Sequence, residues 1–243
     1  MTAAASHQPD IIPGNVLDYY LSQGYYRMHQ DLFTCQFLPI DGGFYTVHWL
    51  RVVLADVTWG PEQRRLLRLN ERFQISLRPF RLTDEYENLY ARYRAAIDFD
   101  APETVEAFTL AGARHNAFPT SVIELRDAGK LIAAGIFDSG EDALAGIMNF
   151  YDPDYRRHSL GKYLMLLKIN YARQQGMTHY YPGYLVHSYP KFDYKLFACR
   201  PATEVFDSFR GYWLPFDWDA VNEHSAELLA AWQERENELR GTE

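Results

Sequence analysis

The segment from His187 to Lys195, HSYPKFDYK, concentrates side chains that can move protons and bind anions. His187 and Asp193 are candidate proton acceptors, because an imidazole and a carboxylate can each take a proton from a nucleophile. Lys191 and Lys195 carry ammonium groups, which pair with carboxylates or with phosphates. The segment therefore predicts a site for acid–base chemistry on an anionic ligand. The alternatives are a buried, hydrogen-bonded His187 and one lysine that serves only as a surface residue.

The elements that must position this segment lie immediately before it. Residues 144–152, LAGIMNFYD, form an apolar run of strand length, which Asp152-Pro153 interrupts. Ser159 then stands where it could cap a helix with apolar residues at helical spacing from Leu160 onward, and Gly176 ends that helix.

The run after the helix, HYYPGYLVH, is rich in aromatic and branched residues. Pro182-Gly183 sits in its middle, which favours a bulged or splayed strand over a fully paired one. We expect such a strand to leave backbone groups free for a ligand.

Three strands precede the apolar helix. Residues 121–127, 130–139 and 144–152 read as strands joined by short turns, and helix and strand follow directly. This order of antiparallel strands, helix and strand resembles the core of the GNAT acyltransferase fold.

The residues also resemble the carboxy-terminal half of arginyl-tRNA–protein transferases and of their bacterial leucyl-transferring relatives. The resemblance rests on YDPDYRRHSLGKY and YYPGYLVHSYPKFDYK, with fainter matches in LSQGYYRMHQDLFTC and in the segment ADVTWGPEQRRLLRLNERF. It spans roughly residues 17–200. One departure is that only Cys35 stands where the arginyl family usually has clustered cysteines.

From this order and this resemblance we predict an α/β (α+β) protein with a GNAT-type acyltransferase fold, built from two tandem GNAT-like units. The expected parts are a flexible leader (1–14), an N-terminal GNAT-like unit (15–75), a C-terminal GNAT-like catalytic unit (76–200) and an acidic helical tail (201–243).

The resemblance implies aminoacyl transfer from tRNA to the α-amine of a protein or peptide that begins with Asp or Glu. The donor ester is already activated, so the protein needs only alignment, a proton acceptor and a place for the oxyanion. His187 or Asp193 would accept the proton. Backbone N–H groups freed near Gly183 would face the oxyanion. No cofactor is expected beyond the aminoacyl-tRNA donor.

The same resemblance implies a set of substrate-binding residues along the motifs. Lys191 and Lys195 would hold the acidic side chain of the acceptor or a tRNA phosphate, and tyrosines would stack on the terminal adenine. The alternatives are a Ser159 that only caps its helix and tyrosines that only pack the core. The full set is Asp152, Ser159, Leu160, Gly161, Tyr181, Gly183, Tyr184, Ser188, Lys191, Tyr194 and Lys195.

The net charge of −8 opposes tRNA binding, which depends on cationic side chains, but the charge is unevenly distributed. The segment from Asp217 onward carries −6 of it. Earlier in the chain, arginines cluster on the expected helix at residues 62–71 and predict a tRNA-binding face, to which two basic residues beside Ser159 are added; the alternative is a solvated amphipathic helix. These residues are Arg64, Arg65, Arg68, Arg72, Arg157 and Lys162.

The composition indicates the cellular compartment in which the protein works. No apolar run reaches the roughly 18 residues of a membrane span, and the first residues lack a secretory signal. Cys35 and Cys199 form no C-x-x-C pair, so we expect no metal and a cytoplasmic protein that does not bind a membrane.

Two other functions stay open. An acyl-CoA enzyme of this fold normally presents a glycine-rich (Q/R)-x-x-G-x-(G/A) turn, whereas RRHSLGKY offers only Gly161. The second is a non-catalytic binder of acidic amino termini. For the favoured transferase, the His-Ser before Pro-Lys favours arginine as the donor amino acid over leucine. The general base, the acceptor and the oligomeric state stay undetermined.

Overall fold

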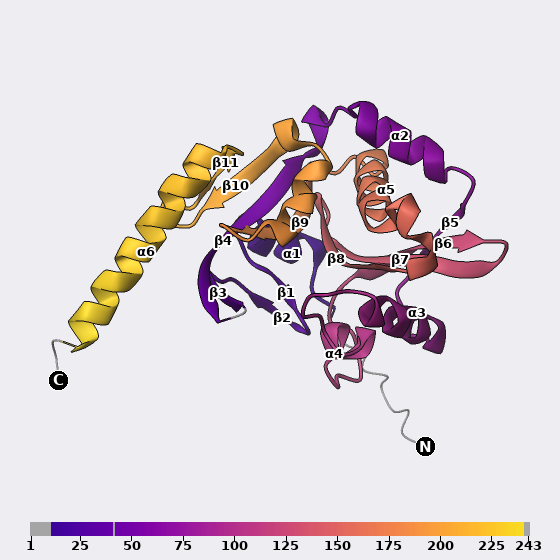
Figure 1. The fold of residues 1–243 in the computed structure, drawn as a ribbon, viewed down its shortest axis with the longest axis horizontal. Coiled ribbons are helices and arrows are strands. Elements are labelled where there is room, and N and C mark those ends of the chain that lie inside the picture. The colour runs from indigo at the N-terminus through magenta and orange to yellow at the C-terminus, as the bar shows by residue number, and fades with distance from the viewer. Residues whose placement is uncertain (1–10, 41, 241–243) are drawn as a thin grey trace, which may run out of the picture.

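The computed structural model describes residues 11–40 and 42–240, and its centre is a continuous β-sheet (Figure 1). The sheet has nine strands in the order β11-β10-β4-β9-β8-β7-β6-β5, with β3 also paired to β4. Strands β1 and β2 form a separate hairpin. The strands are β1 (Tyr26–Met28), β2 (Asp31–Phe33), β3 (Phe37–Ile40), β4 (Gly43–Val53), β5 (Gln74–Pro79), β6 (Thr120–Asp127), β7 (Lys130–Ser139), β8 (Ala143–Tyr151), β9 (His179–Val186), β10 (Thr203–Asp207) and β11 (Tyr212–Pro215).

Helices flank this sheet. The α-helices are α1 (Gly14–Ser22), α2 (Pro61–Asn70), α3 (Asp84–Ala95), α4 (Val105–Thr109), α5 (Leu160–Gln174) and α6 (Trp218–Arg240). The 3₁₀ segments are η1 (Leu54–Asp56), η2 (Pro153–His158), η3 (Pro190–Phe197) and η4 (Arg200–Ala202). Of the predicted leader, residues 1–10 lie outside the described part, and Gly14 begins α1.

The antiparallel run β5-β6-β7-β8, followed by α5 and then by β9 parallel to β8, has the GNAT order. The hairpin between β6 and β7 turns at Ala128 and Gly129, which have φ of 48° and 84°. The predicted mixed α/β, GNAT-type fold is thus confirmed. Strand β4 pairs with β9, so one sheet joins the expected N-terminal and C-terminal units. The domain boundaries themselves stay a prediction.

Helix α5 supplies much of the core beside β7 and β8. Leu160, Leu164 and Ile169 are completely buried there, and each buried aliphatic side chain contributes about 1.5–3 kcal/mol to folding. The prediction that the Ser159 side chain caps this helix was wrong, although Ser159 does stand at the N-cap position. Ser159 occupies the N-cap position with φ 47°, and its side chain makes no capping hydrogen bond. The predicted end of the helix at Gly176 is confirmed, with φ 74°.

Helix α6 packs on the far end of the sheet and projects away from the body (Figure 1). Val221, His224, Ser225 and Leu228 are its buried residues. No helix within the described residues is long and apolar enough to cross a membrane.

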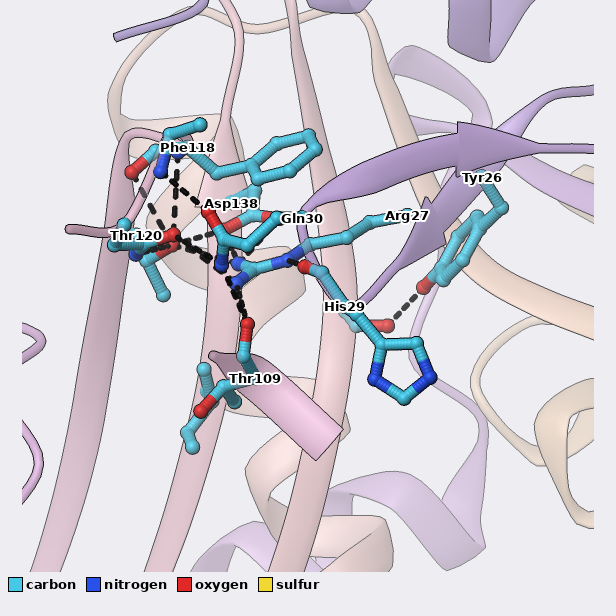
Figure 2. A network of polar contacts seen from close by, with 12 residues as sticks. Tyr26, Arg27, His29, Gln30, Thr109, Phe118, Thr120 and Asp138 are labelled. Atoms are coloured by element: carbon cyan, nitrogen blue, oxygen red, sulfur yellow. Dashed lines mark hydrogen bonds and ion pairs between the residues drawn. The ribbon is translucent and has the colours of Figure 1, made fainter. Parts of the chain in front are cut away.

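A buried ion pair fixes the N-terminal hairpin to the sheet (Figure 2). Nη1 of Arg27 on β1 lies 3.0 Å from Oδ1 of Asp138 on β7, and their side chains are 2% and 0% exposed. The guanidinium also donates to the Thr109 carbonyl at the end of α4 and to Thr120 on β6. Three separate parts of the chain therefore meet at one guanidinium group.

We expect Arg27→Met or Asp138→Leu to destabilise the protein by about 3–5 kcal/mol, because each leaves one buried charge unpaired. Urea unfolding measures the change. The double variant Arg27→Met/Asp138→Leu should recover much of the loss, since it removes both charges. Single-variant losses below about 1 kcal/mol would contradict the clamping role.

Candidate functional site

A cavity opens where β8 and β9 diverge. These strands pair in parallel over only three residue pairs, the last of them Ala145 with Tyr181. Opposite this point, Arg51 of β4 faces both Tyr181 and Pro182, which is a β-bulge. The predicted splayed strand is confirmed, and beyond the split lies a cavity of about 220 Å³.

Tyr26 lies in this split. Its hydroxyl donates to the Gly146 carbonyl on β8 and lies 3.3 Å from the Tyr181 carbonyl on β9. The single hydroxyl proton serves the Gly146 carbonyl, and the phenol oxygen stands between the two diverging strands. Because Arg27 is the next residue, the ion pair with Asp138 also holds this phenol in place.

Gly183 shapes the wall formed by β9. Its φ of 99° is strained for any residue with a side chain. A Cβ here would lie 3.4 Å from Cε of Lys195, an ordinary contact distance, so the positive φ and not the available space favours glycine.

Lys195 reaches the cavity through a cage of aromatic rings. Its Nζ lies 4.6, 4.8 and 5.5 Å from the ring centroids of Phe192, Tyr194 and Tyr184. The residue is only 8% exposed, and no carboxylate of the described residues lies within ion-pair distance of it. Burial lowers the pKa of Lys195 to about 7, against the opposing charge of Asp193. A desolvated ammonium with this environment is a strong anion ligand.

Lys168 of α5 is a second buried cation that the sequence reasoning missed. Its Nζ lies 2.7 Å from the Ile136 carbonyl and 2.8 Å from Oδ1 of Asn149. Burial lowers its pKa to about 7. The signal was present in the sequence, because Lys168 follows Leu160 and Leu164 at four-residue steps on the buried helix face.

In the described part of the chain, the charged side chains that line the first cavity are all basic in type. Arg27, Lys168 and Lys195 line it, together with Asn149 and apolar side chains from β8, α4 and α5. Among the described residues that line it there is no aspartate or glutamate. An anionic side chain and an apolar one suit these walls.

A second, larger cavity of about 570 Å³ adjoins the first. Tyr184, Phe192 and Tyr194 line both cavities and form the partition between them. Lys191 lies in the second cavity, where its Nζ is 3.7 Å from Oδ1 of Asp98.

Several predicted substrate-binding residues therefore meet at one place and others do not. Gly183, Tyr184, Tyr194 and Lys195 line the first cavity. Tyr181 is buried against Trp213, and Ser188 is exposed at the start of the following loop.

The two candidate proton acceptors, His187 and Asp193, have different surroundings. Nε2 of His187 is 2.9 Å from Oδ1 of Asn222 on α6, and His187 lines neither cavity. Asp193 is half-buried in η3, and its Oδ1 is buried without a hydrogen-bond partner among the described residues. Burial raises the pKa of Asp193, while the Lys195 ammonium opposes that shift.

Asp152 lines neither cavity and instead lies in a cluster of charged side chains. The Asp152 carboxylate contacts Lys130 at 2.6 Å and Arg92 at 2.7 Å, and it accepts the Asp154 N–H. Burial raises its pKa, but these donors outweigh burial, so the pKa lies below its usual value. Leu160 is in the core, and Ser159 and Gly161 line neither cavity.

The predicted basic face lies on α2 and beside it. Arg64, Arg65 and Arg68 are exposed, while Arg72 pairs with Asp127 at 3.2 Å. Asn70 at the end of α2 bonds to the carbonyl and ring of His158, which brings α2 next to η2 and its residue Arg157. Lys162 at the start of α5 stacks on Phe197.

Comparison with known proteins identifies relatives. Residues 85–200 match the family described as "Arginine-tRNA-protein transferase, C terminus". The aspartate/glutamate leucyltransferase of Stenotrophomonas maltophilia is 28% identical over 176 residues, covering 69% of this chain and 68% of that protein. The enzyme of the same name from Leptospira interrogans is 29% identical over 192 residues, covering 77% and 73%.

Solved structures are more distant. L-PGS from Bacillus licheniformis is 15% identical with a TM-score of 0.43, covering 73% of this chain and 53% of that one. A GCN5-related N-acetyltransferase from Kribbella flavida is 17% identical with a TM-score of 0.31, covering 59% and 51%. The fold assignment therefore rests on the strand order described above.

Fold and relatives together define an aminoacyltransferase with a GNAT-type fold. Residues 85–200 are thus similar to the C-terminal part of the arginine-tRNA-protein transferases, the family that the motifs predicted.

We expect Gly183→Ala to lower kcat/KM at least tenfold, because relief of the strained φ would move the β9 backbone that contacts Lys195, and to cost about 1–2 kcal/mol of stability through backbone strain. Steady-state kinetics and urea unfolding measure both effects. Gly129→Ala is the matched control, since φ is 84° and its surroundings are open. Equal losses of activity in the two variants would contradict a specific role for Gly183.

His48 predicts a pH-dependent stability. It is completely buried beside His187 and His224, and burial lowers its pKa from 6.5 to about 3. Between these pH values only the unfolded chain binds the proton, so the free energy of unfolding falls as pH falls below 6.5. His48→Gln should reduce this slope by up to about 1.4 kcal/mol per pH unit. Identical slopes for both proteins would contradict this account.

Proposed function

We propose that the protein transfers leucine from charged tRNA to the amino-terminal amine of a protein or peptide that begins with Asp or Glu. The observation that carries the proposal is the cavity between β8 and β9, where the buried Lys168 and Lys195 meet apolar walls and the described lining residues include no carboxylate. The third basic lining residue, Arg27, is already paired with Asp138. The names of the curated relatives support the same donor and acceptor.

Lys195 would bind the acidic side chain of the acceptor. It is buried and caged by aromatic rings, and no carboxylate in the described part of the chain lies within ion-pair distance, so an incoming carboxylate would supply a counter-charge. Lys168 is bonded to backbone and amide oxygens and would add to the positive potential at the cavity wall.

The reaction forms an amide bond between the acceptor nitrogen and the donor carbonyl carbon and breaks the ester bond to the terminal ribose. The ester is already activated, so we propose no cofactor besides the aminoacyl-tRNA. Neither candidate proton acceptor lines a cavity, and we favour Asp193 because it is two residues from Lys195 and its buried oxygen has no partner among the described residues, whereas His187 is bonded to Asn222. The proton then passes to the departing ribose hydroxyl.

The tRNA would approach over α2 and the start of α5. Arg64, Arg65 and Arg68 are exposed there, with Arg157 and Lys162 close by along the chain segment that contacts α2. The acidic helix α6 lies at the opposite end of the sheet, so its charge is kept away from this approach (Figure 1). Binding that uses these cations would weaken with added salt.

Arginine is the second candidate donor, and the second cavity favours it. Asp98 and Asp100 lie there among the rings of Tyr93 and Phe99, and these groups suit a guanidinium. Leucine is preferred because the cavity at the strand split, to which we assign the reacting groups, has apolar walls and no carboxylate among its described lining residues to pair with a guanidinium.

The test is transfer of radiolabelled leucine or arginine from charged tRNA to peptides that begin with Asp, Glu, Asn or Ala. We expect labelled leucine on the Asp and Glu peptides only, and at least a tenfold loss of kcat/KM in Lys195→Met, which removes the cation. Arg240→Met at the exposed end of α6 removes a cation far from the cavity and should keep wild-type rates.

No label with either charged tRNA would overturn the proposal. Incorporation from acyl-CoA instead would indicate an ordinary acyltransferase. Binding of Asp peptides without any transfer would indicate a non-catalytic binder. Preferred use of arginine would replace leucine as the donor.

A further inference from the structure

The second cavity has an electrostatic character opposite to that of the first. Asp98 and Asp100 line it, and Lys191 is its lining cation. Lys191 already lies 3.7 Å from Asp98, with its Nζ also 3.4 Å from the Asp98 carbonyl. No cation of the described residues lies within ion-pair distance of Asp100. One negative charge is therefore left without a partner at this cavity.

Aromatic rings form much of the remaining wall. Tyr93 and Phe99 come from α3 and the loop after it, and Tyr189 comes from the loop before η3. Lys191 already lies over the ring of Phe99 at 5.9 Å. Rings beside a carboxylate favour a cationic or flat apolar side chain and disfavour an anion.

The position of this cavity beside the first one indicates which part of a substrate it could hold. It is separated from the first cavity only by the side chains of Tyr184, Phe192 and Tyr194. Successive Cα atoms of an extended peptide are about 3.8 Å apart, so a chain whose first side chain enters the first cavity brings its second residue to this partition. An RNA end fits less well, because its phosphates would meet the unpaired carboxylate.

We propose that the second cavity binds the side chain at the second position of the acceptor and selects a basic residue over an acidic one there. The inference rests on the proposed function and deepens it, because it names a further specificity of the same site. Asp100 is the main determinant, since Asp98 is already compensated by Lys191.

The test compares peptides that begin Asp-Lys, Asp-Ala and Asp-Glu and are otherwise identical. We expect kcat/KM to be roughly tenfold higher for Asp-Lys than for Asp-Glu, the size of effect that one nearby charge gives at a solvated site. Asp100→Asn should reduce this ratio, and Asp100→Lys should invert it. Glu234→Gln on α6 removes an equal charge at a remote exposed position and should keep the wild-type ratio.

Fluorescence anisotropy with labelled peptides, without any tRNA, measures the same preference independently of turnover. Equal kcat/KM for the three peptides, with transfer intact, would overturn the inference but leave the proposed function standing. A change in the KM for aminoacyl-tRNA in Asp100→Asn, with the peptide ratio unchanged, would assign the cavity to the donor and also overturn it. No transfer to any of the peptides from either charged tRNA would overturn the proposed function instead.

Discussion

The buried ion pair between Arg27 and Asp138 is the interaction on which the site depends. It joins residues 111 positions apart in the chain and ties the β1–β2 hairpin to the sheet. Taking two charges out of water is costly, so such a pair holds its geometry only where further hydrogen bonds complete it. Here Thr109 and Thr120 supply them. The network leaves little freedom for the adjacent Tyr26.

Tyr26 lies between β8 and β9 at the point where these strands separate and the cavity begins. Strands that diverge leave backbone carbonyls without ladder partners, and buried carbonyls of that kind are costly unless something else satisfies them. The Tyr26 hydroxyl contacts the carbonyls of Gly146 and Tyr181, one from each strand. The split between β8 and β9 is thus a stable feature of the fold, available to a substrate.

Basic and acidic side chains are concentrated in different parts of the fold. A protein with net charge −8 keeps three basic side chains on the walls of the cavity at the split, one of them paired with Asp138, and places acidic side chains on α6, at the far end of the sheet. Between the cationic cavity and the neighbouring anionic one stand three aromatic rings, those of Tyr184, Phe192 and Tyr194.

The amino-acid sequence by itself determined the local elements, because their signals are periodic and short-range. Apolar spacing and turn residues predicted β6, β7, β8 and α5, and Pro182-Gly183 predicted the irregular β9. The sequence motifs predicted the family, and they placed Lys195 among the residues of the candidate site, where it lines the first cavity. Tertiary structure alone decided which distant side chains join that lysine. Lys168 and Arg27 enter the cavity and His187 turns toward α6, because the direction of each side chain depends on strand order and register between segments far apart in the chain.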